Sequence, residues 1–304
     1  MSDDERVGRE FGHYRIERVL GRGGFGTVYL AEDLNPHLRR RVALKVLNRE
    51  LAADQAFRER FLRESLMAIE LDHHPSIVPV YDAGEQEDTL YIAMRYIEGP
   101  DLLTAIAQRG PLQPEEALTI VSQVASALDA AHGAGLVHRD VKPGNVLLSP
   151  DMKRAYLADF GLTKRVSAES GITRVGQFLG TFYYAAPEQI EGRAVDGRTD
   201  LYALGCVLYE ALTGGPPFSG DMSAIIAAHL TQPPPSATAA RAGLPPAVDA
   251  VIVRAMAKLP DQRYQTGAEF AEAATRALSR AGETVHGRTP PPPPPSVAGP
   301  VTPP

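Results

Sequence analysis

Two short motifs place the side chains that phosphoryl transfer requires close together in the chain. Residues 138–145 read His-Arg-Asp-Val-Lys-Pro-Gly-Asn, so one acid, one lysine and one amide share a single loop. Asp159 follows at the start of the glycine turn Asp159-Phe160-Gly161. A carboxylate can orient an attacking hydroxyl, a cation can spread the charge of the moving phosphoryl group, and an Asn with a second Asp can hold Mg²⁺. Either motif alone occurs by chance, whereas both in this order point to this chemistry.

A glycine-rich stretch precedes these motifs and could cover phosphate groups. Residues 21–28 read Gly-Arg-Gly-Gly-Phe-Gly-Thr-Val, and glycines let backbone amides approach phosphate oxygens. A dinucleotide-binding fingerprint is the rival interpretation, but it needs a helix after the glycines. Here residues 27–30 have a strand pattern, and Val42-Ala43-Leu44-Lys45 follows. A glycine loop between two strands, ahead of a strand lysine, favours a role for Lys45 in binding nucleotide phosphates.

The hydrophobic periodicity divides the chain into a strand-rich part and a helix-rich part. Predicted strands cover residues 14–20, 27–33, 41–47, 77–81 and 90–94. Predicted helices cover residues 56–71, 114–134, 201–212, 246–258 and 266–281. Glu98-Gly99-Pro100 breaks the pattern between the two parts, so we expect a hinge there.

Ala186-Pro187-Glu188, Asp200 and Arg263 complete a pattern that resembles the protein Ser/Thr kinases, most closely the bacterial receptor-type, eukaryotic-like kinases. The likeness runs from residue 14 to residue 278. It implies an α+β, protein-kinase-like two-lobe fold, with a five-stranded antiparallel sheet and one helix in the N-terminal lobe and a mainly helical C-terminal lobe. The expected boundaries are a flexible N-terminus at 1–13, the N-terminal lobe at 14–94, the hinge at 95–99, the C-terminal lobe at 100–281 and a Pro-rich disordered tail at 282–304.

The resemblance also implies an ATP- and Mg²⁺-dependent transferase that phosphorylates Ser and Thr hydroxyls of proteins. Asp140 would be the catalytic base and Lys142 would stabilise the transferred phosphoryl group. Asn145 and Asp159 would bind Mg²⁺.

Lys45 would hold the α- and β-phosphates and pair with a carboxylate on the helix at 56–71. Glu64 matches the family position better than Glu59 or Glu70. The rest of the ATP site would comprise the glycine loop, the sheet, the hinge and the floor of the cleft: Gly21, Gly23, Gly24, Phe25, Gly26, Val28, Ala43, Met94, Arg95, Ile97, Asp101 and Leu147. Asp101 has two interpretations, since it could accept hydrogen bonds from the ribose or cap the following helix.

Further residues would support or regulate the site. In the family pattern Glu188 and Arg263 form a buried ion pair, Asp200 braces the backbone of the catalytic loop, and Thr181 bonds Asp140 and Lys142. Thr173 stands where similar kinases carry an activating phosphothreonine, and Arg139 would receive its phosphate. Val175 stands where those relatives often have a second Thr, and an unmodified polar loop is the alternative.

Composition restricts the class of protein. The 304 residues carry a net charge of −6, which argues against non-specific nucleic-acid binding. The single cysteine, Cys206, cannot form an internal disulfide, and its apolar neighbours predict a buried hydrophobe. No uncharged apolar run reaches the ~18 residues of a membrane helix. We therefore expect a cytoplasmic protein.

The end of the chain is rich in proline, with six consecutive prolines at 290–295. This composition predicts an extended polyproline linker. In similar receptor-type kinases such a linker leads to a membrane helix, so we expect membrane attachment only if a segment follows Pro304. Protein substrates are the expected partners, and a dimer would allow autophosphorylation in trans.

Two other functions compete with an active protein kinase. A pseudokinase, a nucleotide-binding scaffold without turnover, would lack Lys45, Asp140, Asn145 or Asp159, and all four are present. A small-molecule phosphotransferase of similar fold is disfavoured by Ala186-Pro187-Glu188, which is typical of kinases with protein substrates.

Overall fold

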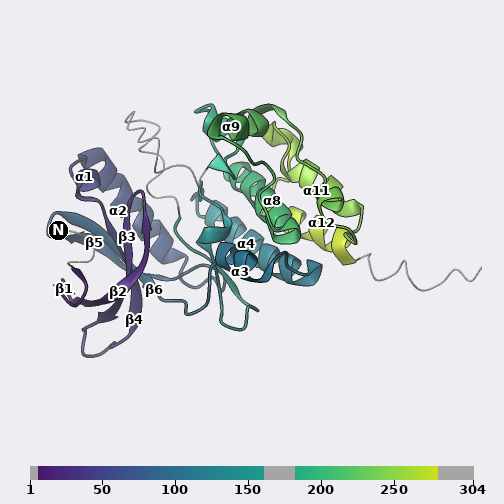
Figure 1. The fold of residues 1–304 in the computed structure, drawn as a ribbon. Helices are drawn as coiled ribbons and strands as arrows, with labels where there is room; N and C mark the ends of the chain where they lie inside the picture. Colours follow the sequence, from purple (N-terminus) through teal and green to yellow (C-terminus); the bar gives the residue numbers. More distant parts are fainter. Residues whose placement is uncertain (1–5, 161–181, 280–304) are drawn as a thin grey trace, which may run out of the picture.

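One antiparallel sheet forms the N-terminal lobe (Figure 1). The computed structural model describes residues 6–160 and 182–279. The strands lie in the order β1-β2-β3-β4-β6-β5, with β1 at Glu10–Phe11, β2 at Tyr14–Gly23, β3 at Gly26–Asp33, β4 at Arg41–Leu47, β5 at Val80–Gln86 and β6 at Thr89–Arg95. The two-lobe α+β fold predicted from the sequence is confirmed.

The strand predictions were wrong in two details. The sheet has six strands rather than five, because Glu10 and Phe11 pair with β2. A two-residue strand is too short to show an alternating pattern. The strand expected at residues 77–81 begins instead at Val80 and continues through the polar residues to Gln86, whereas Ile77 forms an isolated bridge to Leu157.

The two faces of the sheet have different neighbours. Val42, Leu44 and Val46 point to one face, where they pack with Phe11 and Tyr14. Ala43 and Leu47 point to the other face and belong to the main core. Since side chains alternate along a strand, Lys45 lies on the same face as Ala43 and Leu47, toward the cleft between the lobes.

Helix α2 (Gln55–Glu70) packs on β5, next to the four-residue α1 (Arg49–Ala52). Asp54 caps α2 by accepting hydrogen bonds from the amides of Ala56 and Phe57 at 2.9 and 3.2 Å. Phe57, Phe61 and Ala68 form its buried stripe, as the helical spacing predicts.

Helices dominate the C-terminal lobe. Its α-helices are α3 (Leu102–Arg109), α4 (Pro114–Gly133), α7 (Pro187–Ile190), α8 (Gly197–Thr213), α9 (Met222–Thr231), α10 (Ala237–Ala240), α11 (Ala247–Ala255) and α12 (Gly267–Ser279). Two 3₁₀ turns, η2 (Pro143–Asn145) and η3 (Pro260–Gln262), and the hairpin of β7 (Val146–Leu148) and β8 (Ala155–Leu157) complete it. None of the helices in residues 6–160 and 182–279 has the length and apolar composition of a membrane span.

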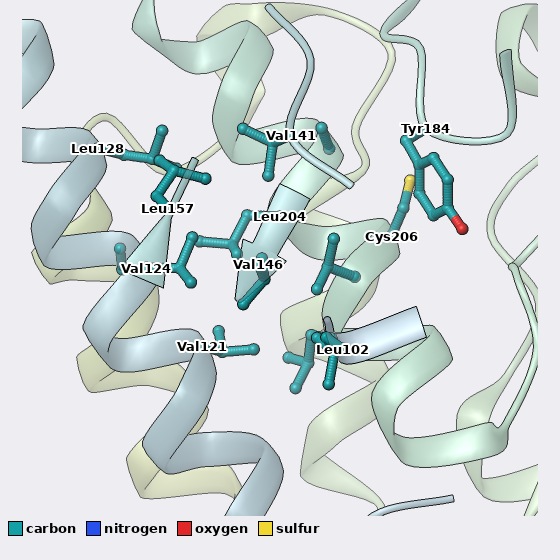
Figure 2. Packing of buried hydrophobic residues seen from close by; sticks show 14 of the residues in the cluster. Leu102, Val121, Val124, Leu128, Val141, Val146, Leu157, Tyr184, Leu204 and Cys206 are labelled. Atoms are coloured by element: carbon teal, nitrogen blue, oxygen red, sulfur yellow. The ribbon is translucent and has the colours of Figure 1, made fainter. Parts of the chain in front are cut away.

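The core of this lobe holds the loop that carries the candidate catalytic residues. Val121, Val124 and Leu128 of α4 pack with Leu204 of α8, and Val141 joins the same cluster (Figure 2). Because Val141 stands between Asp140 and Lys142, its burial fixes both polar neighbours at the surface of the core. Cys206 is also fully buried there, and burial raises the pKa of its thiol, so it is the small core residue that its context predicts.

Candidate active site

The structure brings Asp140, Lys142 and Asn145 together. Oδ2 of Asp140 accepts hydrogen bonds from Nζ of Lys142 at 2.8 Å and from Nδ2 of Asn145 at 3.1 Å. The same Asn145 nitrogen also donates to the Asp140 carbonyl at 2.8 Å. The carboxylate is therefore held in one orientation beside a cation, which is the arrangement needed to orient a hydroxyl and stabilise a phosphoryl group.

Asp200, at the start of α8, holds the backbone of this loop. Its Oδ1 accepts from the Arg139 amide at 2.7 Å, and its Oδ2 accepts from the His138 amide at 2.8 Å. Nε2 of His132, on α4, donates to the same Oδ2 at 2.8 Å. Arg139 has a φ of 64°, a strained value for a residue other than glycine, and the bonds to Asp200 stabilise it. The backbone of Arg139, the residue before Asp140, is thus held by a side chain of α8.

His138 has a structural role. Its Nε2 faces the Ala158 carbonyl at 3.0 Å, so this nitrogen carries the proton and Nδ1 accepts from the Asp140 amide at 3.2 Å. Complete burial lowers the pKa of His138, which keeps the ring neutral. The ring also packs on Phe160, with 4.8 Å between centroids. His138 therefore orients Asp140 and links it to the segment that contains Asp159.

Lys45 and Asp159 meet across the cleft. Nζ of Lys45, on β4, donates to Oδ1 of Asp159 at 2.6 Å. Asp159 has a φ of 61°, in the left-handed region, and it directly follows Ala158, whose amide donates to the Asn145 carbonyl at 2.9 Å. Glu64 lies on α2, but within residues 6–160 and 182–279 no ion pair joins it to Lys45. The Lys45–Glu64 pair stays a prediction.

Asn145 and Asp159 fit a magnesium ion. Both offer oxygen ligands, and the Asn145 nitrogen is engaged with Asp140, which leaves its amide oxygen for a metal. Mg²⁺ is usually bound by one or two protein oxygens together with substrate phosphates and water. In the described part of the chain no three His, Cys, Asp or Glu side chains form a metal-binding group.

The glycine loop connects β2 to β3 above β4. Gly26 has a φ of 154°, and a Cβ at this position would lie 2.1 Å from the Val46 carbonyl oxygen, so only glycine fits. Asn48 fixes the loop with two hydrogen bonds. Its backbone N–H donates to the Phe25 carbonyl at 2.9 Å, and its side-chain Nδ2 donates to the Gly24 carbonyl at 3.0 Å.

Residues 99–101, which follow β6, lie against strand β7. A Cβ at Gly99 would lie 2.0 Å from the Leu148 carbonyl oxygen, so this glycine lets the hinge approach β7 closely. Asp101 bridges to Leu147, and Met94 pairs with Ala43 across β6 and β4. These contacts join Asp101 to Leu147 and Met94 to Ala43, and the role of these four residues in binding ATP stays a prediction.

Asp101 caps helix α3. Its Oδ1 accepts from the Thr104 amide at 2.8 Å, and its Oδ2 accepts from the Thr104 hydroxyl at 2.9 Å. This geometry supports the capping interpretation, and contact with a ribose stays a prediction.

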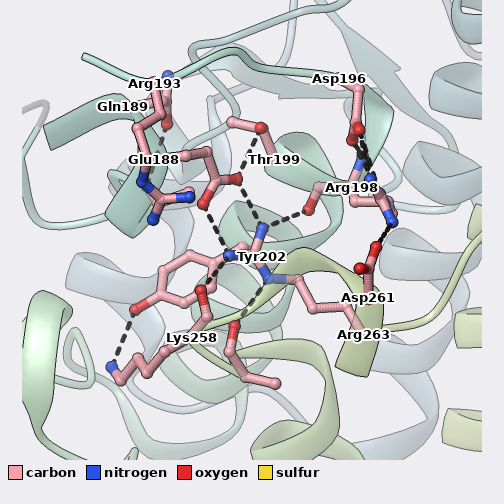
Figure 3. Close-up of polar contacts among 12 residues, drawn as sticks. Glu188, Gln189, Arg193, Asp196, Arg198, Thr199, Tyr202, Lys258, Asp261 and Arg263 are labelled. Carbon is pink, nitrogen blue, oxygen red and sulfur yellow. Dashed lines mark hydrogen bonds and ion pairs between the residues drawn. The ribbon is translucent and has the colours of Figure 1, made fainter. Parts of the chain in front are cut away.

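Glu188 and Arg263 form a buried, bidentate ion pair below the site, with N–O distances of 2.7 and 2.8 Å (Figure 3). The Thr199 hydroxyl donates to Glu188 at 2.7 Å. The remaining three N–H groups of Arg263 donate to the carbonyls of Ala257, Arg198 and Lys258. Burial raises the pKa of Glu188, but the bonds to Arg263 outweigh it, so this pKa lies below its usual value.

Some candidate residues lie outside the described residues, and some contacts were not predicted. Thr173 and Thr181 fall in 161–181, so their predicted contacts lie outside the described part of the chain. Sequence reasoning missed Asn48 and His132, and it missed Gln189, whose Nε2 donates to the Arg139 carbonyl at 2.9 Å. Their signal was only the ordinary hydrogen-bonding capacity of Asn, Gln and His.

Comparison with known proteins agrees with this geometry. The protein kinase domain model matches residues 14–269. Over 279 residues the chain is 47% identical to serine/threonine-protein kinase PknE of Mycobacterium tuberculosis, covering 91% of this chain and 48% of that protein. It is 45% identical over 282 residues to PknH and 46% identical over 297 residues to PknJ, both serine/threonine-protein kinases of Mycobacterium bovis. These matches cover 92% and 96% of this chain and 46% and 49% of the relatives. The chain spans about half the length of the curated relatives it matches, and it belongs to the protein kinase family, among the bacterial eukaryotic-like Ser/Thr kinases.

Proposed function

We propose that this chain is an active catalytic domain that transfers the γ-phosphate of Mg-ATP to Ser and Thr hydroxyls of proteins. The observation that carries the proposal is the convergence of Lys142 and Asn145 on the Asp140 carboxylate. Lys45 and Asp159, in contact across the cleft, supply the second half of the site.

Each side chain has a distinct task in this mechanism. Asp140 accepts a hydrogen bond from the acceptor hydroxyl and then its proton, and Lys142 stabilises the negative charge beside it. Lys45 anchors the phosphates of the nucleotide from β4. Asn145 and Asp159 hold Mg²⁺, which when bound neutralises charge on the phosphates.

An inactive, nucleotide-binding scaffold is the second candidate function. The presence and mutual contacts of the four catalytic positions favour the enzyme. The test is incorporation of labelled phosphate from Mg-ATP, into the chain itself and into Thr- and Ser-containing peptides. We expect Asp140→Asn to reduce incorporation by at least ~10²-fold while nucleotide binding persists. Asp151→Asn is the matched control, because Asp151 is an exposed turn residue of the same lobe. Equal incorporation by wild type and Asp140→Asn would contradict the proposal.

Regulation follows from the same site. We infer that Thr173 is autophosphorylated in trans and that its phosphate docks on Arg139, next to the catalytic carboxylate. Thr173→Ala should lower activity toward an external peptide, with Ser170→Ala as the matched control. Mass spectrometry detects whether Thr173 carries phosphate, and a peptide assay measures activity. Full activity of a protein without phosphate at Thr173 would refute this role.

The setting of the domain is also inferred. The expected location is the cytoplasm, and the expected partners are protein substrates. A dimer is the arrangement that phosphorylation in trans requires.

A further inference from the structure

A buried chain of hydrogen bonds ends on the backbone of Tyr183, close to the catalytic loop. His229 of α9 is completely buried, and its Nε2 lies 3.1 Å from the Tyr183 carbonyl oxygen. Its Nδ1 lies 2.8 Å from the hydroxyl of Tyr202 on α8. Nζ of Lys258, which follows α11, lies 3.4 Å from that hydroxyl (Figure 3). The same Nζ lies 3.2 Å from the Ala228 carbonyl oxygen. A chain of contacts from three helical regions therefore ends, through His229, at one backbone carbonyl.

The donor and acceptor of each hydrogen bond in this series follow from the Tyr183 carbonyl. A carbonyl only accepts, so Nε2 of His229 carries the proton and Nδ1 must accept from the Tyr202 hydroxyl. The Tyr202 oxygen then accepts from Lys258. Burial lowers the pKa of His229 to about 4, which keeps the ring in the neutral form that this pattern needs.

The groups that face His229 leave little freedom for another arrangement. The ring of Phe218 packs edge-on against the imidazole, with 4.9 Å between centroids. Lys258 is the nearby charged group, and its charge disfavours a proton on His229. Burial in turn lowers the pKa of Lys258 to about 8.

The anchored segment, residues 182–189, is joined at one end to the loop that carries Asp140. At its far end Gln189 donates to the carbonyl of Arg139, the residue before Asp140. Between these ends the Tyr184 hydroxyl donates to Glu210 of α8 at 2.7 Å. The segment is thus attached to the catalytic loop, to α8 and, through His229, to α9. A peptide that presents a hydroxyl to Asp140 approaches the loop to which Gln189 is bonded, whereas the predicted nucleotide contacts lie at Lys45 and the glycine loop.

We propose that His229 is a positioning residue for the protein substrate: by fixing the Tyr183 backbone it sets the shape of the surface against which the acceptor peptide binds. The inference rests on the proposed kinase function and deepens it. Loss of the Nε2–H donor frees the Tyr183 carbonyl and lets residues 182–184 shift away from α9. Peptide binding then weakens, because a small displacement of a positioning surface reduces the fraction of correctly placed acceptor. Nucleotide binding is unaffected.

The experiment compares His229→Leu, which removes both ring nitrogens, with His229→Gln, which keeps an N–H donor at the Nε2 position. Tyr202→Phe removes the hydroxyl that donates to Nδ1 of His229, and so it perturbs the same series of hydrogen bonds at the next residue. This variant still provides the test if His229→Leu does not fold. Asp129→Ala is the matched control. It removes the carboxylate that accepts from the Gly267 and Ala268 amides at the start of α12, and so perturbs the lobe away from residues 182–189. The probe is a Thr-containing peptide selected on the wild-type chain from a positional library.

The expected result is a rise in the peptide KM of about tenfold to 10²-fold in His229→Leu, with the ATP KM unchanged. His229→Gln should recover most of the loss, Tyr202→Phe should raise the peptide KM, and Asp129→Ala should leave both KM values unchanged. A peptide KM that stays at the wild-type value in His229→Leu and Tyr202→Phe, or a Gln variant as impaired as the Leu variant, would overturn the role of His229 while leaving the kinase function standing. Absence of transfer by the wild-type chain would overturn the proposed function and this inference with it.

Discussion

The ammonium group of Lys45 lies 2.6 Å from Oδ1 of Asp159, so the proposed phosphate anchor and the proposed metal ligand are direct partners across the two lobes. One comes from β4 and the other follows β8, and 114 residues separate them in the chain. The two functions assigned to them are therefore coupled through a single short contact.

Substitution of either partner should abolish turnover. We expect Lys45→Met and Asp159→Asn each to reduce phosphate transfer by at least ~10²-fold at saturating Mg-ATP. Lys45→Met should leave the Asn145–Asp159 metal site intact, so Mn²⁺ titration with nucleotide, followed by electron paramagnetic resonance, should still detect metal binding. Asp159→Asn should lose it. Near wild-type turnover in either variant would show that the assigned role is wrong.

The Glu188–Arg263 pair should dominate the stability of the C-terminal lobe. Arg263→Met leaves the buried Glu188 carboxylate without its partner, and such a loss costs about 3–5 kcal/mol of unfolding free energy. Arg276→Met is the control, because Arg276 pairs with Glu272 on an exposed face of α12, where a pair contributes less than about 1 kcal/mol. Denaturant unfolding measures both variants. Equal, small losses would contradict the assigned role of the buried pair.

The protein should lose stability in acid partly through His229. The pKa of His229 in the folded protein is about 4, against 6.5 for an ordinary histidine, so between these pH values the unfolded chain takes up a proton that the folded chain does not. The free energy of unfolding therefore falls as the pH drops from 6.5 to 4. In His229→Gln this proton uptake is absent. The slope of unfolding free energy against pH gives the number of protons taken up on unfolding, and this number should be smaller by up to about one in the variant. Identical slopes for the two proteins would refute the buried neutral state of His229.

Substrate choice near the acceptor should depend on Gly144. A Cβ at this position would meet no atom of residues 6–160 and 182–279 within 4 Å, and residue 144 itself supplies no charge beside Asn145. We expect the wild-type chain to select only weakly for Arg upstream of the acceptor. Gly144→Glu should increase that selection by about two- to fivefold, the range of an exposed ion pair, whereas Gly144→Gln should not. A positional peptide library measures all three proteins, and strong Arg selection by the wild type would show that other acids line the groove.

The sequence predicted the parts of this molecule that local patterns encode. Helix α2 begins and ends within one residue of its expected bounds, because the buried Phe57 and Phe61 have helical spacing and Asp54 caps the start. The two motifs single out Asp140 and Asp159, which the structure places in contact with Lys142 and Lys45, and their catalytic roles stay predictions. Strand β1 was missed because two residues carry no periodicity. The ties from Asn48 to Gly24 and from Gln189 to Arg139 were missed because a side-chain bond to a distant backbone carbonyl leaves no local pattern.

The three bonds that Asp200 accepts have a consequence for the motions of the catalytic loop. Two of these bonds come from the backbone amides of His138 and Arg139, and the third comes from the His132 side chain of α4. The catalytic-loop segment, α4 and α8 are therefore joined at one buried carboxylate. Exposure of either amide to solvent requires the separation of elements that form the centre of the lobe. Hydrogen–deuterium exchange at these two amides should therefore proceed only through large-scale unfolding, and the loop that carries Asp140 should be among the slowest-exchanging segments of the chain.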